Sequence, residues 1–155
     1  FCDISTGELY ATDISGRDYY RILTNQLSSY SPREILFGGD IINLKQLPEF
    51  IKSKLSAGVE MLDDDKFELS LCRETVEQQF PDEMHLISDK PVVISSVGAL
   101  INYLRETQMS GLERINHLEI YNEAQYMRLD YNTQRNLELT QTMLSNFLTK
   151  GVQNE

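Results

Sequence analysis

Cysteine, histidine and long apolar runs are all scarce in this chain of 155 residues, which has two Cys and two His. Cys2 and Cys72 lie far apart in the sequence, so they form no disulfide framework, and no metal-ligand spacing surrounds either of them. We therefore expect reduced thiols, as in the cytoplasm. No apolar run approaches the roughly 20 residues that a membrane span needs, so we expect no contact with a membrane.

The first residues carry none of the features of a signal peptide. The chain opens on Phe1-Cys2-Asp3, without Met, a basic region or a cleavage site. This opening leads directly into a strand-like pattern. We therefore expect the chain to be a fragment of a longer protein.

Positive charge is also in short supply. The chain has 14 Lys and Arg against 24 Asp and Glu, giving a formal net charge of −10. Because binding to nucleic acids depends largely on phosphate contacts from Lys and Arg, the chain is a poor stand-alone DNA binder. Its 41% of hydrophobic and 25% of charged residues are those of an ordinary globular domain.

Predicted strands and helices alternate along the chain. This order is typical of an α/β sheet covered by helices, with a hairpin at its start. The segment 83–90 is predicted to be a loop. The predicted strands are 1–5, 8–14, 34–37, 59–62, 117–121 and 126–129, and the predicted helices are 18–30, 44–55, 68–80, 91–107 and 130–148.

The helix at 91–107 has the strongest signal. Pro91 suits a first helical turn, where its missing N–H costs nothing. A wide apolar stripe follows at helical spacing and predicts a buried face: Val93, Ile94, Val97, Leu100, Ile101 and Leu104.

The sequence offers one candidate for a catalytic or metal-binding residue. Gly38-Gly39 lacks the Lys and Ser or Thr of a phosphate loop, so a turn is predicted there. His85 and His117 have no evident ligand partners, and we expect both to be structural or exposed. The candidate is Asp3, which stands on the first strand, ahead of a Gly-containing turn.

Asp3 has two interpretations. The opening resembles that of ribonuclease H-like nucleases, in which several carboxylates hold two metal ions, and that of actin-like ATPases. Asp3 would then be a metal ligand, with Asp13, Asp40 or Asp130 as partners. Alternatively, Asp3 accepts hydrogen bonds from the backbone N–H groups of the hairpin turn, as Asp often does. We favour this second interpretation.

Four segments, in order, resemble the MutS family of DNA mismatch repair proteins. Residues 3–9 are similar to its "D-x-S-T-G-E" motif, and residues 32–36 to its "P-x-E-I/L-L" strand. Residues 98–108 are similar to "GALLxYLxxTQ", and residues 127–139 to "MxLDxxTRRNLEL". There are departures: Gln134 stands where Arg is common, the middle of the chain matches loosely, and residues 144–155 leave the pattern.

The resemblance implies a ribonuclease H-like mixed sheet flanked by helices, with a C-terminal helix leading into the lever region. Residues 1–126 would form the connector domain (domain II). Residues 127–155 would form the junction and first helix of the lever/core domain. The fragment would have no catalytic, cofactor-binding or metal-binding residues of its own.

The resemblance also implies the context of the fragment. The parent would be a bacterial, cytoplasmic, nucleoid-associated homodimer. It would bind mismatched DNA through a preceding domain, and it would hydrolyse ATP with Mg²⁺ in a distant C-terminal one. The connector would transmit changes between them, contact the other MutS domains and dock MutL.

Candidate residues for these roles follow. We expect MutL to contact the exposed face of the helix at 73–79, through Glu74 and Thr75, although a merely solvated helix face is the alternative. Leu129 and Asp130 form the candidate hinge, because a short strand followed by a helix N-cap can absorb backbone rotation. The two alternative functions are a metal-dependent nuclease and a generic interaction domain.

Overall fold

The computed structural model describes residues 1–38, 41, 44–108 and 110–122. Phe1–Tyr121 form one compact unit. The strand predicted at 126–129 and the helix predicted at 130–148 lie outside the described residues. The candidate hinge residues Leu129 and Asp130 lie outside them too.

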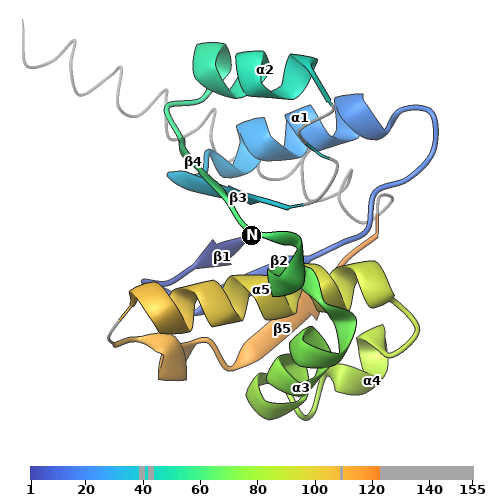
Figure 1. Cartoon of the computed structure of the whole chain (residues 1–155), viewed down its shortest axis with the longest axis vertical. Coiled ribbons are helices and arrows are strands. Elements are labelled where there is room, and N and C mark those ends of the chain that lie inside the picture. Colours follow the sequence, from blue (N-terminus) through green and yellow to red (C-terminus); the bar gives the residue numbers. More distant parts are fainter. Residues whose placement is uncertain (39–40, 42–43, 109, 123–155) are drawn as a thin grey trace, which may run out of the picture. The chain divides into compact units, whose positions relative to one another are not determined.

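A three-stranded mixed sheet contains both ends of the unit (Figure 1). Its strands are β1 (Cys2–Asp3), β2 (Glu8–Ala11) and β5 (His117–Ile120), in the order β1-β2-β5. The first two are antiparallel, with Asp3 opposite Glu8, which confirms the predicted hairpin. The last two are parallel, so the strand that ends the unit returns beside the hairpin.

A second sheet consists of two parallel strands, β3 (Glu34–Phe37) and β4 (Gly58–Met61). The helices α1 (Tyr19–Tyr30) and α2 (Gln46–Lys54) belong with this sheet. Residues of α1 pack against its core, which we call the small core. The small core is formed by four buried residues: Ile35, Phe37, Leu47 and Ile51. All four elements lie where the periodicity predicted them.

The first sheet belongs to a larger core, in which α3 (Leu69–Gln79) and α5 (Pro91–Thr107) are the principal helices. The short elements η2 (Asp64–Phe67), α4 (Met84–Ile87) and η3 (Leu112–Arg114) complete it. We call it the large core. The bounds predicted for α5 are confirmed, and five of its six stripe residues are buried: Val93, Ile94, Val97, Ile101 and Leu104.

The prediction of a loop over 83–90 was wrong, because α4 occupies part of it. The turn is held by the Met84 N–H, which donates to the Phe80 carbonyl at 3.1 Å, and by Ile87, which is fully buried in the large core. One turn of helix is too short for an apolar period to show in the sequence.

The α/β class with a mixed sheet is therefore confirmed. Two separately bonded sheets lie in the described part of the chain, each with its own core. Among the helices described, none combines the length and hydropathy that crossing a membrane requires.

Candidate functional site

Asp3 is engaged in the hairpin turn. Its Oδ1 accepts the Ser5 N–H at 2.9 Å, the Ser5 hydroxyl at 2.6 Å and the Thr6 N–H at 3.4 Å. The Asp3 carbonyl accepts the Gly7 N–H at 2.8 Å. This confirms the prediction that Asp3 accepts hydrogen bonds within the turn.

The same contacts affect the ionisation of Asp3. The Ser5 hydroxyl, followed by the Ser5 and Thr6 N–H groups, holds the pKa of the Asp3 carboxyl below its ordinary value of 3.8. Of the carboxylates considered as metal partners, Asp13 forms an ion pair with Lys90 at 3.1 Å, and Asp40 and Asp130 lie outside the described residues. Among the described residues, no group of three or more His, Cys, Asp or Glu side chains is placed to hold a metal ion.

Gly7 is required in this turn for two independent reasons. Its φ is +78°, in the left-handed region that favours glycine. A Cβ at this position would also overlap the Arg114 carbonyl oxygen and lie 2.8 Å from the Arg114 carbonyl carbon. The turn therefore packs directly against the backbone just before β5.

The two histidines lie on the surface. His117 Nδ1 is 2.8 Å from Glu83 Oε1, which links β5 to the start of α4. His85 is exposed on α4. Both placements agree with the expectation of structural or exposed histidines.

The inner face of α3 packs very closely against α5. A Cβ on Gly98 would lie 2.5 Å from the Cys72 Cα and 2.7 Å from the Cys72 carbonyl oxygen, so only glycine allows the two helices to approach this far. Burial raises the pKa of the Cys72 thiol, whose Sγ donates to the Lys66 carbonyl at 3.3 Å. This thiol is therefore a packing group and a poor nucleophile.

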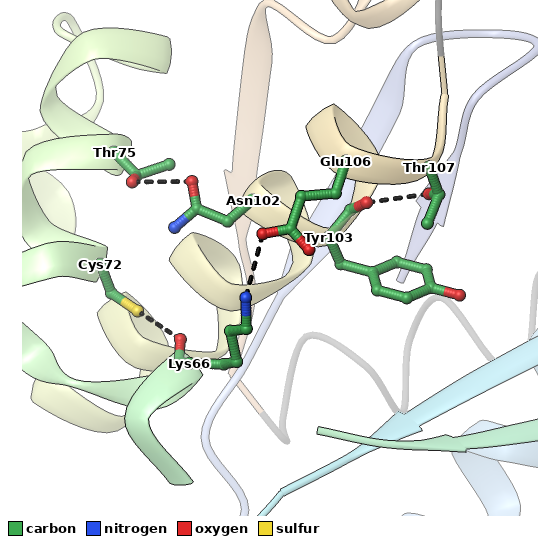
Figure 2. A network of polar contacts seen from close by, with 7 residues as sticks. All are labelled: Lys66, Cys72, Thr75, Asn102, Tyr103, Glu106 and Thr107. Carbon is green, nitrogen blue, oxygen red and sulfur yellow. Dashed lines mark hydrogen bonds and ion pairs between the residues drawn. The ribbon is translucent and has the colours of Figure 1, made fainter. Parts of the chain in front are cut away.

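Figure 2 shows the polar contacts that accompany this packing. Thr75 Oγ1 lies 3.0 Å from the Asn102 Oδ1 and also donates to the Leu71 carbonyl at 3.0 Å. Lys66 Nζ forms an ion pair with Glu106 at 3.0 Å. Thr75, Cys72 and Val76 form the buried stripe of α3, at the spacing of one helix face.

The expectation that Thr75 is exposed was therefore wrong. Its side chain is 4% exposed and lies in the α3–α5 interface. Its hydroxyl is satisfied there by the Leu71 carbonyl and by Asn102, so burial leaves no unpaired polar group. Glu74 is exposed, as expected.

We define the outer face of α3 as the exposed residues Leu71, Glu74, Glu77 and Gln78. Gln78 Nε2 donates to Glu74 Oε1 at 3.4 Å. The next residue, Gln79, holds the end of the helix in place: its Nε2 donates to the Ile115 carbonyl at 2.6 Å, and its Oε1 accepts from Arg105 at 3.2 Å. The outer face is thus acidic, partly apolar and rigidly mounted.

Several contacts of described residues join elements around the large core to elements of the small core. Tyr103 on α5 donates its hydroxyl to Glu34 Oε1 at 2.5 Å, and this bond raises the pKa of Tyr103 to about 12. Gly38, after β3, faces the Phe67 ring, where a Cβ would lie 2.5 Å from Cδ2. Tyr121 donates its hydroxyl to the buried Gln26 at 3.1 Å.

The residues that form the Asp3 turn and the α3–α5 interface lie in a segment that matches one protein family. A family model described as MutS domain II matches residues 1–119, so the chain belongs to that family. The resemblance to the MutS family is thereby confirmed.

Particular relatives agree. The chain is 37% identical over 145 residues to the DNA mismatch repair protein MutS of Caldicellulosiruptor bescii, covering 93% of this chain and 15% of that protein. It is 31% identical over 141 residues to that of Acetivibrio thermocellus, covering 91% and 16%. It is 36% identical over 149 residues to the MutS of Alkaliphilus oremlandii, covering 92% of this chain and 17% of that protein. The chain thus spans about a sixth of the length of these curated relatives, and is a MutS domain II module.

Proposed function

We propose that this module is the connector of a DNA mismatch repair MutS protein. It transmits conformational change between the parts of the parent that bind mismatched DNA and hydrolyse ATP with Mg²⁺, and it docks MutL. The observation that carries the proposal is the match to MutS domain II over residues 1–119, within relatives about six times as long. The parent is a cytoplasmic, nucleoid-associated homodimer, and this module catalyses no reaction.

The hairpin and the mixed sheet support a ribonuclease H-like ancestry for the fold. In such nucleases the first-strand carboxylate binds metal. Here the Asp3 Oδ1 accepts hydrogen bonds from Ser5 and Thr6, and Asp13 pairs with Lys90. Both arrangements favour a structural role for these carboxylates.

Transmission is supported by the way the two cores are joined. A module that passes on a conformational state needs rigid parts and a small number of contacts that can rearrange. The hydrogen bond between Tyr103 and Glu34 and the contact between Gly38 and Phe67 are such contacts. The hinge at Leu129 and Asp130 is the second element of this proposal, at the handover to the lever region.

For MutL, the outer face of α3 is the surface that the contacts favour. Glu74 lies on it, whereas Thr75 supports it from beneath by fixing α3 on α5. Leu71, at 44% exposed, gives this acidic surface an apolar contact. A basic and partly apolar surface on MutL would be complementary to it.

The test uses a full-length MutS carrying this module. We expect Glu74→Lys combined with Glu77→Lys to weaken ATP-dependent MutL recruitment by about tenfold, because two attractive charges become repulsive. Mismatch binding and ATPase activity should be retained. Glu49→Lys, an exposed glutamate on α2, is the matched control. Unchanged recruitment by the double variant would refute this docking surface.

A nuclease is the competing function, and one assay separates the two. Labelled DNA and RNA are incubated with the chain while Mg²⁺ or Mn²⁺ is titrated. We expect no metal-dependent cleavage. Cleavage that disappears in Asp3→Asn would replace the connector proposal by a two-metal nuclease.

A further inference from the structure

Among the described residues, no strand pairs with the backbone groups on the outer edge of β4. The Gly58 N–H donates to the Arg33 carbonyl, and the Leu62 N–H to the Phe37 carbonyl, each at 2.8 Å. In a parallel pair, alternate residues direct their N–H and C=O groups toward the neighbouring strand. The backbone groups of Val59 and Met61 therefore point away from β3, and in the described part of the chain no strand pairs with that edge.

The same two residues carry exposed apolar side chains. Val59 is 48% exposed and Met61 is 46% exposed. The register places Val59 opposite Ile35 and Met61 opposite Phe37, both buried in the small core. Residues opposite each other in a sheet share a face, so Val59 and Met61 extend the apolar face of β3 outward to the open edge.

The opposite face of β4 is acidic. Glu60 alternates with the two apolar residues, so its side chain lies on the other face, which also carries Glu34. Glu60 is exposed, and the exposed residues Asp63, Asp64 and Asp65 follow the end of the strand. The cation next in sequence, Lys66, is paired with Glu106.

We propose that β4 binds an extended segment of a partner protein in which aliphatic residues alternate with Lys or Arg. The segment adds a strand to the open edge, and its backbone bonds with Val59 and Met61. Its aliphatic side chains lie beside those of these two residues, and its basic side chains lie beside Glu60. A further basic residue lies over Asp63–Asp65.

A second copy of β4 fits this edge poorly. Its own alternation of Val59, Glu60 and Met61 would bring carboxylates together on one face of the joined sheet, which is unfavourable. Edge strands are commonly protected against such pairing by inward charges, Pro or bulges. The four residues Gly58–Met61 contain Glu60 as their single charge.

The test uses the 155-residue chain and two short fluorescent peptides, one alternating Val with Lys and the other alternating Val with Glu. Fluorescence anisotropy should show binding of the Val–Lys peptide and little binding of the Val–Glu peptide. Glu60→Lys should reverse this preference, because it inverts the charge on the pairing face. No binding of the Val–Lys peptide, or no reversal in Glu60→Lys, overturns the proposal.

Val59→Pro tests the backbone pairing. Proline removes the outward N–H and leaves the bonds to β3 intact, so affinity for the Val–Lys peptide should fall by about tenfold. Val92→Ser, at an apolar side chain that is 69% exposed on α5, should leave it unchanged. Sedimentation of the unmodified chain supplies the remaining check: a dimer that Val59→Pro dissociates would make a second copy the occupant and overturn the proposal. If Val59→Pro does not fold, the charge reversal at Glu60 decides.

Discussion

Gly7→Ala should destabilise the unit far more than the same substitution at two other glycines. Gly7, Gly16 and Gly111 all have positive φ, at +78°, +93° and +94°. A Cβ on Gly16 would meet nothing within 4 Å, and one on Gly111 would meet only the Ile4 Cγ2, at 3.7 Å. A Cβ on Gly7 would overlap the backbone of Arg114. The three positions thus separate backbone strain from steric overlap.

The magnitudes follow from these two effects. A non-glycine residue in the left-handed region costs about 1–2 kcal/mol. Alanine also lowers the entropy of the unfolded chain, which offsets about 0.4–1 kcal/mol of that cost. We expect a net loss of about 1 kcal/mol for Gly16→Ala and Gly111→Ala. Gly7→Ala must also move backbone, which adds about 1–3 kcal/mol, so we expect a loss of about 3 kcal/mol.

Urea denaturation of the three variants, followed by circular dichroism, measures these losses. With a slope of about 1–3 kcal/mol per molar urea, a difference of about 2 kcal/mol moves the midpoint by about 1 M. The slope should be the same for all three variants, because the surface exposed on unfolding is the same. Losses that agree within about 0.5 kcal/mol would show that the backbone of Arg114 does not confine Gly7, and the packing of this turn against η3 would be refuted.

Three further changes probe the cores and their contacts. Ile101→Asp puts a charge at a fully buried position of α5, so the chain should lose its cooperative unfolding transition. Ser96→Asp, on the exposed face of the same helix, should keep that transition, and thermal unfolding followed by circular dichroism distinguishes the two variants. Tyr103 should titrate with a pKa of about 12, so the stability from its bond to Glu34 is complete below pH 10.0 and lost as the pH rises through about 12. The difference in tyrosinate absorbance between the unmodified chain and Tyr103→Phe, followed against pH, checks this pKa. The pKa of Asp3 lies below 3.8, so the stability from its turn bonds is present above pH 3.8 and lost as the pH falls further; stability curves of Asp3→Asn should lack that acid-dependent loss.

Helices with a long apolar period could be predicted from the sequence, and the single turn of α4 could not. The stripe Val93–Leu104 gave α5 with its bounds, and Ser31-Pro32 gave the end of α1, where Ser31 has a left-handed φ of 46°. The helix α4 has a single turn and depends on burial of Ile87 in the large core. Such tertiary stabilisation leaves no periodic signal in the local sequence.

The division into two sheets was also beyond the sequence. Strand pairing depends on contacts between residues far apart, such as Glu8 with His117, and on which apolar faces meet. Ile35 and Phe37 could be predicted to be buried, but not that they would form a core with Leu47 and Ile51, apart from the one around α5.

The turn at Asp3 could be predicted from the sequence, whereas the exposed face of α3 could be predicted only in part. The turn bonds of Asp3 follow from the short Asp side chain beside a Gly-containing turn, and they are present. Thr75 was placed with Glu74 on the exposed face of the helix, but it is buried. Cys72 and Gln79, which lie three and four residues from Thr75, carry the signal that puts it on the inner face.

The contrast between the two helix faces has a consequence for any mutational map of MutL docking. Thr75→Val would remove the hydroxyl that pairs with Asn102 and loosen α3 on α5, at a cost of about 1–2 kcal/mol. Glu74→Lys would leave that packing intact and change the surface charge. A loss of MutL recruitment in both variants therefore has two different causes, and only a loss in Glu74→Lys at unchanged stability identifies a contact. The helix α5 contacts α3 through Asn102 and η2 through Glu106, and it bonds Glu34 of β3 through Tyr103. The helix α5 is thus the element through which a docking event on α3 would reach the small core.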